Sequence, residues 1–399
     1  MQEMKYLDRI KRNITRLTPG DQSALIAFQK EIEDPDLPPF DKQHYQWAHE
    51  KNPHRRAGGP QFWIYRKEDG TVHGQQVGIP FSLSVQGKSY TASWAVDLMV
   101  RPEFRMRGIG NALSEVLRQE SDITVGIGIT DDAYQSCLRA GWINLGKMQV
   151  FLRPLDTKRM LPLFNRSPDN VIHWTAATLC NTILYAVDLG CSLLTWFSGV
   201  KLEKTEEFDR RVDQVWEAAS KFYPVIAKRD FKSLQWRFDA VAEARHYQRF
   251  YLYKDGNICG YVVVRNSKRD SVAVATIVDF LCPPSLIAPL MANCITTLRR
   301  SGAAVIYCRA SFPRASKYLY PLGFCKRPSF TRIMASLNKK AGLPQELISE
   351  QSAWYITTAD SDGDYREAGS SQSQLPVAEE KNDLLVRPSH TKAGKASVL

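Results

Sequence analysis

The apolar and polar positions of this chain follow the two periods of a mixed α/β fold. Runs of β-branched and aromatic residues bounded by turn residues predict strands at 13–17, 62–66, 72–83, 90–100, 123–129 and 146–152. Apolar residues spaced three and four apart predict helices after Asp21, over 111–120 and over 131–140. This order predicts a mixed central sheet with helices on both faces.

The second half of the chain repeats this order. The run Val96–Met99 (VDLM) is matched by Val278–Leu281 (VDFL), and Gly141-Trp142 by Gly323-Phe324, both 182 residues later. An Asp-Gly turn at 69–70 recurs at 255–256, an offset of 186 residues. A near-constant offset predicts an internal duplication, with two copies of one domain.

We therefore divide the chain into four parts. Two domain copies occupy residues 1–155 and 208–340, an apolar helical linker occupies 156–207, and a C-terminal extension occupies 341–399. From about residue 370, Ser, Gln, Lys and Glu dominate and aromatic residues vanish, which predicts disorder.

The linker contains an apolar segment. Between Val171 and Val200 the one formal charge is Asp188, and the segment is long enough to span a bilayer. Asp188, Asn181 and several threonines interrupt it, however. We predict a buried or amphipathic pair of helices between the two copies. A helix that dips into a membrane interface is the alternative.

The chain is basic, with a net charge of +11 and a pI of about 9.2. Residues 1–340 carry +15, whereas the remainder, with nine acidic and five basic residues, carries −4. A basic body favours an anionic partner. Because the basic residues are scattered and no nucleic-acid-binding motif occurs, we do not expect nucleic acid to be that partner.

The eight cysteines form no C-x-x-C pair and have no accompanying His cluster, so neither a disulfide framework nor a metal site is predicted. They indicate buried thiols in a reducing compartment. The charged N-terminus lacks the apolar core of a secretory signal. We expect a cytoplasmic protein, with contact between Val171–Val200 and a membrane surface as an additional possibility.

One segment has the features of an anion-binding loop. In the run 97–111 (DLMVRPEFRMRGIGN), Pro102 ends a strand, and Gly108 and Gly110 allow the backbone to approach a ligand closely. Successive amides then begin a helix, where free N–H groups and the helix dipole attract anions. Arg105 and Arg107 add positive charge. These features predict a pyrophosphate site.

The run Arg105–Gly110 (RMRGIG) resembles the acetyl-CoA loop of the GNAT superfamily of N-acetyltransferases, whose motif is (Arg/Gln)-x-x-Gly-x-(Gly/Ala). The following strand, helix and Gly141-Trp142 match the next element of that family. The resemblance covers residues 12–155 well and 208–340 in a more degenerate form. It implies two GNAT-like domains, acetyl-CoA as co-substrate and no metal.

The resemblance also implies roles for single residues. Backbone groups at the end of the strand would meet the acetyl group and the pantetheine arm, and the loop amides would hold the pyrophosphate. Asp97 would deprotonate the amine acceptor, directly or through water. A structural role within the sheet is the alternative, which the matching Asp279 favours. The cofactor-binding residues are then Met99, Val100, Arg105, Met106, Arg107, Gly108, Ile109, Gly110 and Asn111.

Two departures from the family pattern concern catalysis. The Tyr that usually protonates the leaving thiolate falls on Cys137, and the usual Asn at the helix start falls on Thr130. Cys137 and Tyr134 are the candidate acids, with a buried structural thiol as the alternative for Cys137. In the second copy, Cys282-Pro283-Pro284 replaces the loop, so no CoA site is predicted there.

These features predict an acetyl-CoA-dependent N-acyltransferase whose acceptor is an amine, or a sugar hydroxyl, of a small molecule, sugar or peptide. A loose similarity of Leu234–Phe238, Trp354-Tyr355 and Asp360–Asp362 to tandem GNAT-like proteins encoded with envelope-polysaccharide enzymes suggests an amino sugar. The alternative is a scaffold or sensor that binds CoA without turnover.

Overall fold

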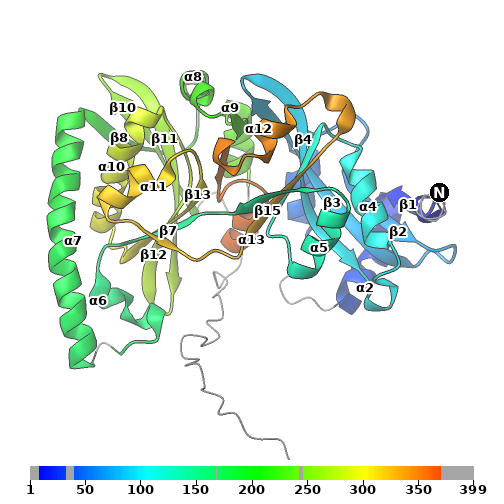
Figure 1. The fold of residues 1–399 in the computed structure, drawn as a ribbon, viewed down its shortest axis with the longest axis horizontal. Helices are drawn as coiled ribbons and strands as arrows, with labels where there is room; N and C mark the ends of the chain where they lie inside the picture. Colours follow the sequence, from blue (N-terminus) through cyan, green and yellow to red (C-terminus); the bar gives the residue numbers. More distant parts are fainter. Residues whose placement is uncertain (1–8, 33–39, 168, 242–245, 370–399) are drawn as a thin grey trace, which may run out of the picture.

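The first copy has the predicted order of elements. The computed structural model describes residues 9–32, 40–167, 169–241 and 246–369, so the disorder predicted from about residue 370 lies outside the described residues (Figure 1). The elements of the first copy are β1 (Ile14–Arg16), α2 (Gln22–Ile32), α3 (Lys42–Tyr45), β2 (Phe62–Arg66), β3 (Val72–Val85), β4 (Lys88–Val100), α4 (Ile109–Arg118), β5 (Ile123–Ile127), α5 (Asp131–Arg139), β6 (Ile143–Lys147) and β7 (Val150–Pro154).

The second copy repeats these elements. Its last three strands begin at Val305, Cys325 and Arg332, each 182 residues after the start of β5, β6 and β7. The elements are β8 (Val200–Thr205), α8 (Val212–Ala219), β9 (Val225–Ala227), α9 (Phe231–Leu234), β10 (Tyr247–Lys254), β11 (Asn257–Arg269), β12 (Val272–Leu281), α10 (Ile287–Arg300), β13 (Val305–Ser311), α11 (Ala315–Leu319), β14 (Cys325–Arg327) and β15 (Arg332–Leu337).

The two copies exchange their last strands. β7 pairs antiparallel with β13 and β14 of the second copy, and β15 pairs with β5 and β6 of the first. The prediction of a single strand at 146–152 in the first sheet is therefore wrong. Residues in this stretch belong to two strands, β6 and β7, and β7 lies in the other copy. Alternating apolar residues determine which face of a strand is buried, but they do not determine which sheet it joins.

The C-terminal extension connects the copies. It contains α12 (Gln345–Ser349), β16 (Trp354–Thr357) and α13 (Gly363–Gly369). β16 pairs with β9 and β13, and β9 pairs with β3. Among the described residues the strands thus join into a 16-stranded sheet, whose main path is β6-β15-β5-β4-β3-β9-β16-β13-β12-β11-β10-β8.

The linker forms one long helix rather than the predicted buried pair. After the short α6 (Thr157–Met160), α7 (Val171–Ser198) runs for 28 residues along the outer edge of the second copy, against α10 (Figure 1). Within the described part of the chain it is the one helix long and apolar enough to cross a membrane, by length and composition. Most of its large apolar side chains are exposed, so the prediction of a buried pair is wrong.

Candidate active site

β4 and β5 run parallel and separate at their carboxyl ends. Their pairing ends at Trp94 and Val125, although β4 continues to Val100 and β5 to Ile127. The pairing of β3 with β4 is also irregular here, between Gln75 and Val77. At this bulge Asp97 has a φ of 52°. Backbone groups of β4 therefore lack a β5 partner at this opening and are available to a ligand.

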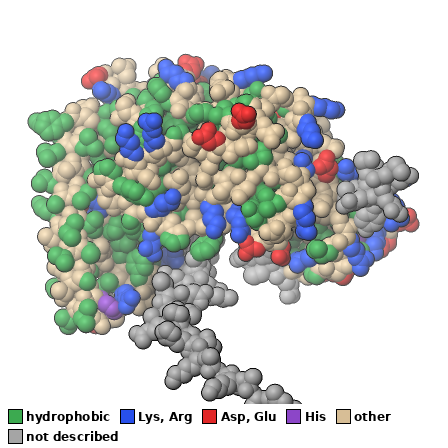
Figure 2. Space-filling view, in the orientation of Figure 1, with side chains coloured by type: hydrophobic (Ala, Val, Ile, Leu, Met, Phe, Trp, Pro, Cys, Tyr) green, Lys and Arg blue, Asp and Glu red, His purple; other side chains and the backbone are tan. Residues whose placement is uncertain are grey.

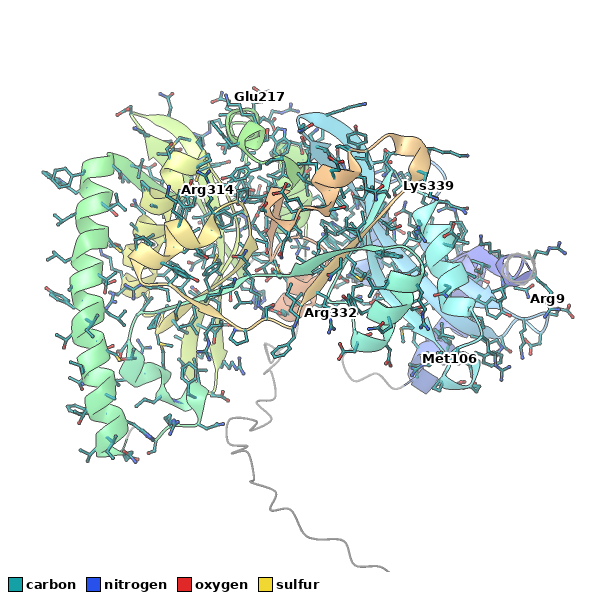
Figure 3. The ribbon with its side chains drawn as sticks, in the orientation of Figure 1. Arg9, Met106, Glu217, Arg314, Arg332 and Lys339 are labelled. Carbon is teal, nitrogen blue, oxygen red and sulfur yellow. The ribbon has the colours of Figure 1, made fainter. Side chains whose placement is uncertain are left out.

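The turn from β4 to α4 places a helix N-terminus beside the opening. Gly108 is the N-cap of α4 with a φ of 78°, a left-handed conformation that favours glycine. The first amides of α4 have no acceptor within the helix. A Cβ on Gly110 would lie 3.8 Å from Val100 Cγ2, so the helix begins against the end of β4. Met106 points outward from this turn and is 93% exposed (Figure 3).

The structure brings the predicted cofactor-binding residues together around this opening. Arg105 Nε donates to the carbonyl of Val100 at 3.1 Å, and the Arg107 guanidinium lies 5.3 Å from the centroid of Phe104. Asn111 Oδ1 accepts a hydrogen bond from Ser136 at 2.6 Å, which joins α4 to α5. The backbone amides, dipole and two cations can together hold a pyrophosphate.

The two candidate acids lie on α5, which follows β5. The Tyr134 hydroxyl accepts a hydrogen bond from Asn144 Nδ2 at 3.1 Å, on β6 and therefore two strands away from β5. Burial raises the pKa of the half-buried Cys137 thiol, and Arg118 opposes that shift. Thr130 caps α5 by accepting from the amide of Ala133. The role of either residue as the acid remains a prediction.

Asp97 belongs to a charged network that the C-terminal extension completes. Arg366 on α13 donates to Asp97 at 2.6 Å and to Asp362 at 2.7 Å. His44 Nε2 lies 3.1 Å from Asp362. Burial raises the pKa of Asp97, although the charge of Arg366 opposes this. The pKa of Asp362 is instead lowered, because Arg366 and His44 outweigh the effect of its burial.

An aromatic stack from three parts of the chain lies beside this network. The Trp47 ring stacks on Trp236 of the second copy at 4.7 Å between centroids and on Tyr365 of α13 at 4.5 Å. His44 also contacts the Trp47 and Tyr365 rings. Our sequence reasoning did not identify His44, Tyr365 or Arg366. The one available signal was the acidic pair in Asp360–Asp362.

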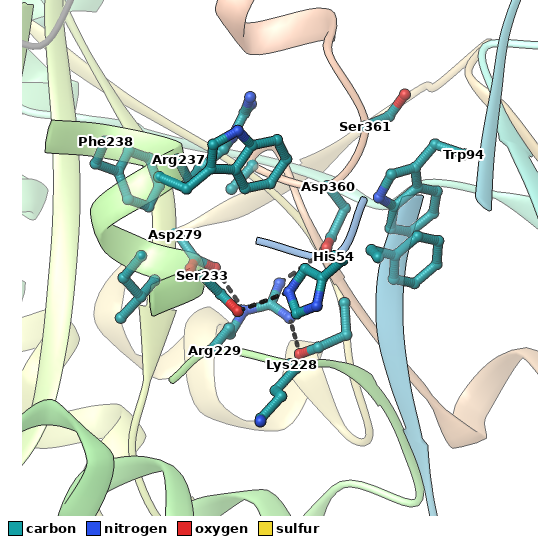
Figure 4. Close-up of a pocket in the computed structure, with 15 residues that line it drawn as sticks. His54, Trp94, Lys228, Arg229, Ser233, Arg237, Phe238, Asp279, Asp360 and Ser361 are labelled. Atoms are coloured by element: carbon teal, nitrogen blue, oxygen red, sulfur yellow. Dashed lines mark hydrogen bonds and ion pairs between the residues drawn. The ribbon is translucent and has the colours of Figure 1, made fainter. Parts of the chain in front are cut away.

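A pocket between the two copies adjoins the same elements (Figure 4). One wall is Phe81 stacked on Trp94, with centroids 4.0 Å apart. Opposite them, His54 Nε2 lies 3.0 Å from the Ser233 hydroxyl. Burial lowers the pKa of His54 to about 4, so this ring is neutral at physiological pH. Since Trp94 precedes Asp97 on β4, the pocket is a candidate cleft for the acceptor.

Asp279, the counterpart of Asp97, has a different environment. It is buried and accepts hydrogen bonds from Arg229 at 3.1 Å, Tyr261 at 2.7 Å and Thr357 at 2.8 Å. Arg229 also pairs with Asp360 at 2.7 Å. These contacts join β11, β12 and the C-terminal extension, so Asp279 has a structural role in the second copy.

We expect Asp279→Asn to lower the free energy of unfolding by about 3 kcal/mol, because it leaves buried Arg229 with one carboxylate fewer. Urea unfolding followed by circular dichroism would measure this loss. Glu217→Gln is the matched control, since Glu217 is exposed on α8 and also loses one carboxylate charge (Figure 3). A loss below about 1 kcal/mol for Asp279→Asn would contradict the structural role.

Comparison with known proteins gives similarity in fold. No family model and no curated protein sequence matches the chain. A GCN5-related N-acetyltransferase from Anabaena variabilis superposes with a TM-score of 0.56 at 13% identity, over 84% of this chain and 74% of that one. The N-myristoyltransferase of Saccharomyces cerevisiae, solved with myristoyl-CoA, gives 0.50 at 12% identity, over 81% and 82%. A probable N-acyltransferase from Enterococcus faecalis gives 0.54 at 11% identity, over 81% and 72%.

Proposed function

We propose, on the premise that this chain has the tandem GNAT fold, that it transfers an acyl group from acyl-CoA to an amine. The observation that carries the proposal is the opening between β4 and β5, with the N-terminus of α4 beside it. Free amides and a helix dipole at that position suit the pyrophosphate of CoA. The thioester would then lie along the unpaired end of β4.

Acetyl-CoA is the donor that we propose. The side chains of Trp94 and Met99, on the strand that would carry the thioester, are buried in the core of the first copy. A filled core at the opening favours a short acyl group over a long one. The S. cerevisiae relative was solved with myristoyl-CoA, so a longer acyl chain is the alternative to be tested.

Asp97 is the base that we propose for the acceptor. An ammonium group has no lone pair with which to attack a thioester, so transfer requires proton removal. Asp97 lies at the strand opening, and burial raises its pKa towards the range useful for a base. Arg366 would act as a positioning residue, since it holds the Asp97 carboxylate and joins it to Asp362.

The acceptor would enter through the cleft between the copies. The pocket lined by Trp94, His54 and Trp236 offers aromatic faces and polar groups to a sugar or a peptide amine. An amino sugar is our first candidate. The second copy has prolines where the CoA loop would be, which is consistent with a role in forming this cleft rather than in holding CoA.

Release of CoA thiol tests the proposal. The full chain would be mixed with acetyl-CoA and, separately, with an amino sugar, a peptide amine or no acceptor. We expect thiol release that depends on an acceptor and is slower with myristoyl-CoA. Binding of acetyl-CoA without release for any amine would instead favour the scaffold or sensor, which the Cys137 and Thr130 departures make the second candidate.

A further inference from the structure

The helix α7 places its polar residues towards the protein. Asn181 Oδ1 accepts hydrogen bonds from the amide and the hydroxyl of Thr157, at 2.8 and 2.6 Å. Asp188 pairs with the fully buried Arg153 at 2.5 Å and also with Arg299. A surface helix of a soluble protein has the opposite arrangement, because its apolar stripe faces the core.

The opposite side of α7 is apolar along its whole length. Its exposed positions carry no Lys, Arg, Asp or Glu from Val171 to Phe197. Figure 2 shows this face as a column of apolar side chains along one edge of the molecule. A continuous apolar surface of this kind marks a contact with another apolar phase. The large side chains of this outward face, each 48–77% exposed, are Val171, Ile172, Trp174, Leu179, Ile183, Tyr185, Leu189, Leu193, Trp196 and Phe197.

Cations surround the N-terminal end of this face. The Lys158 ammonium lies 3.8 Å from the centroid of Trp174, and Arg166 lies 3.3 Å from His173. The Arg327 guanidinium lies 5.7 Å from the ring of Phe164, which is 43% exposed. We call Lys158, Arg159, Arg166 and Arg327 the basic rim. Cations next to exposed aromatic rings suit the boundary between acidic headgroups and acyl chains.

We propose that the outward face of α7 lies in the interface of an anionic lipid bilayer, with the helix parallel to the membrane plane and the basic rim on the headgroups. The charge of the rim and the lack of charge on the face together favour a bilayer over a protein partner. The proposal does not depend on the transferase function.

The attachment of α7 to the second copy argues for this orientation rather than for a span. α7 packs along α10, and the Asp188 ion pairs are close to the middle of its length. A spanning helix would have to lose both pairs and place Asp188 within the hydrocarbon, where a carboxylate is costly. In the parallel orientation Asp188 keeps its partners.

Flotation of the full chain with vesicles tests the proposal. We expect binding to phosphatidylcholine mixed with phosphatidylglycerol, and weaker binding to phosphatidylcholine alone. Leu179→Glu with Ile183→Glu should weaken binding at least about 10-fold, because it charges the buried face. Phe330→Glu is the control, since Phe330 is 63% exposed but lies outside α7. Each Gln replacement at Arg166 or Arg327 should weaken binding about five-fold.

A fluorophore on the helix gives a second readout that needs no charged variant. Cys180 is exposed on the outward face, and Cys325 is the other exposed cysteine. An environment-sensitive dye on Cys180 in a Cys325→Ser background should shift to the blue on anionic vesicles and be quenched by shallow, not deep, lipid quenchers. No binding to anionic vesicles overturns the proposal. So does a dimer without lipid that the double Glu variant converts to monomer, because a second copy would then cover the face.

Discussion

Replacing Gly108 by Glu should weaken the binding of acetyl-CoA about 100-fold, equivalent to about 3 kcal/mol. The new carboxylate would lie at the N-terminus of α4, where the proposed pyrophosphate binds, and would repel it. It would also occupy the site of positive potential that the helix dipole provides. Isothermal titration of the full chain with acetyl-CoA would measure the loss.

The control for this substitution is Gly108→Asn. Asn tolerates the left-handed conformation that Gly108 adopts at a φ of 78° and adds no charge. We therefore expect it to keep affinity within about 10-fold of the original, a change of about 1.4 kcal/mol. Equal binding by the original chain and Gly108→Glu would remove the assignment of the loop, whatever the transfer assay shows.

Replacing Asp97 by Asn should lower kcat by about 10²- to 10⁴-fold, the usual contribution of a general base. Asn also accepts the positive φ of this position, so the bulge should persist and the affinity for acetyl-CoA should change little. Steady-state thiol release with the best amine would give kcat, and titration with acetyl-CoA would give the affinity.

The pH profile separates a base from a structural carboxylate. A base acts only when deprotonated, and burial raises the pKa of Asp97. The rate of the original chain should therefore rise with pH through that raised pKa, and the rise should be absent in Asp97→Asn. Asp69→Asn, in the exposed turn before β3, is the control. An unchanged kcat with a lower melting temperature would assign Asp97 to structure alone.

Local features of the sequence predicted much of the fold and part of the candidate site. The loop Arg105–Gly110 lies at a strand-to-helix turn as expected, because glycine spacing and a strand-ending proline act within a few residues. The constant offset of 182 residues predicted the tandem fold, because duplicated strands keep their spacing even when their residues diverge.

Features that depend on distant contacts could not be predicted in this way. Asp97 and Arg366 are 269 residues apart, and neither carries a local sign of the other. The exposure of α7 was hidden because its composition suits a buried helix equally well. Likewise, β7 has the same alternation whether it joins the first sheet or the second.

The exchange of β7 and β15 has a consequence for the history of the chain. If the link between the copies were cut, each half would fold only by receiving a strand from the other, as two subunits do in a domain-swapped homodimer. An ancestor with one copy would have the same pairing between two identical chains. Gene fusion would then preserve an existing assembly, and each copy would become free to diverge while its partner stayed attached.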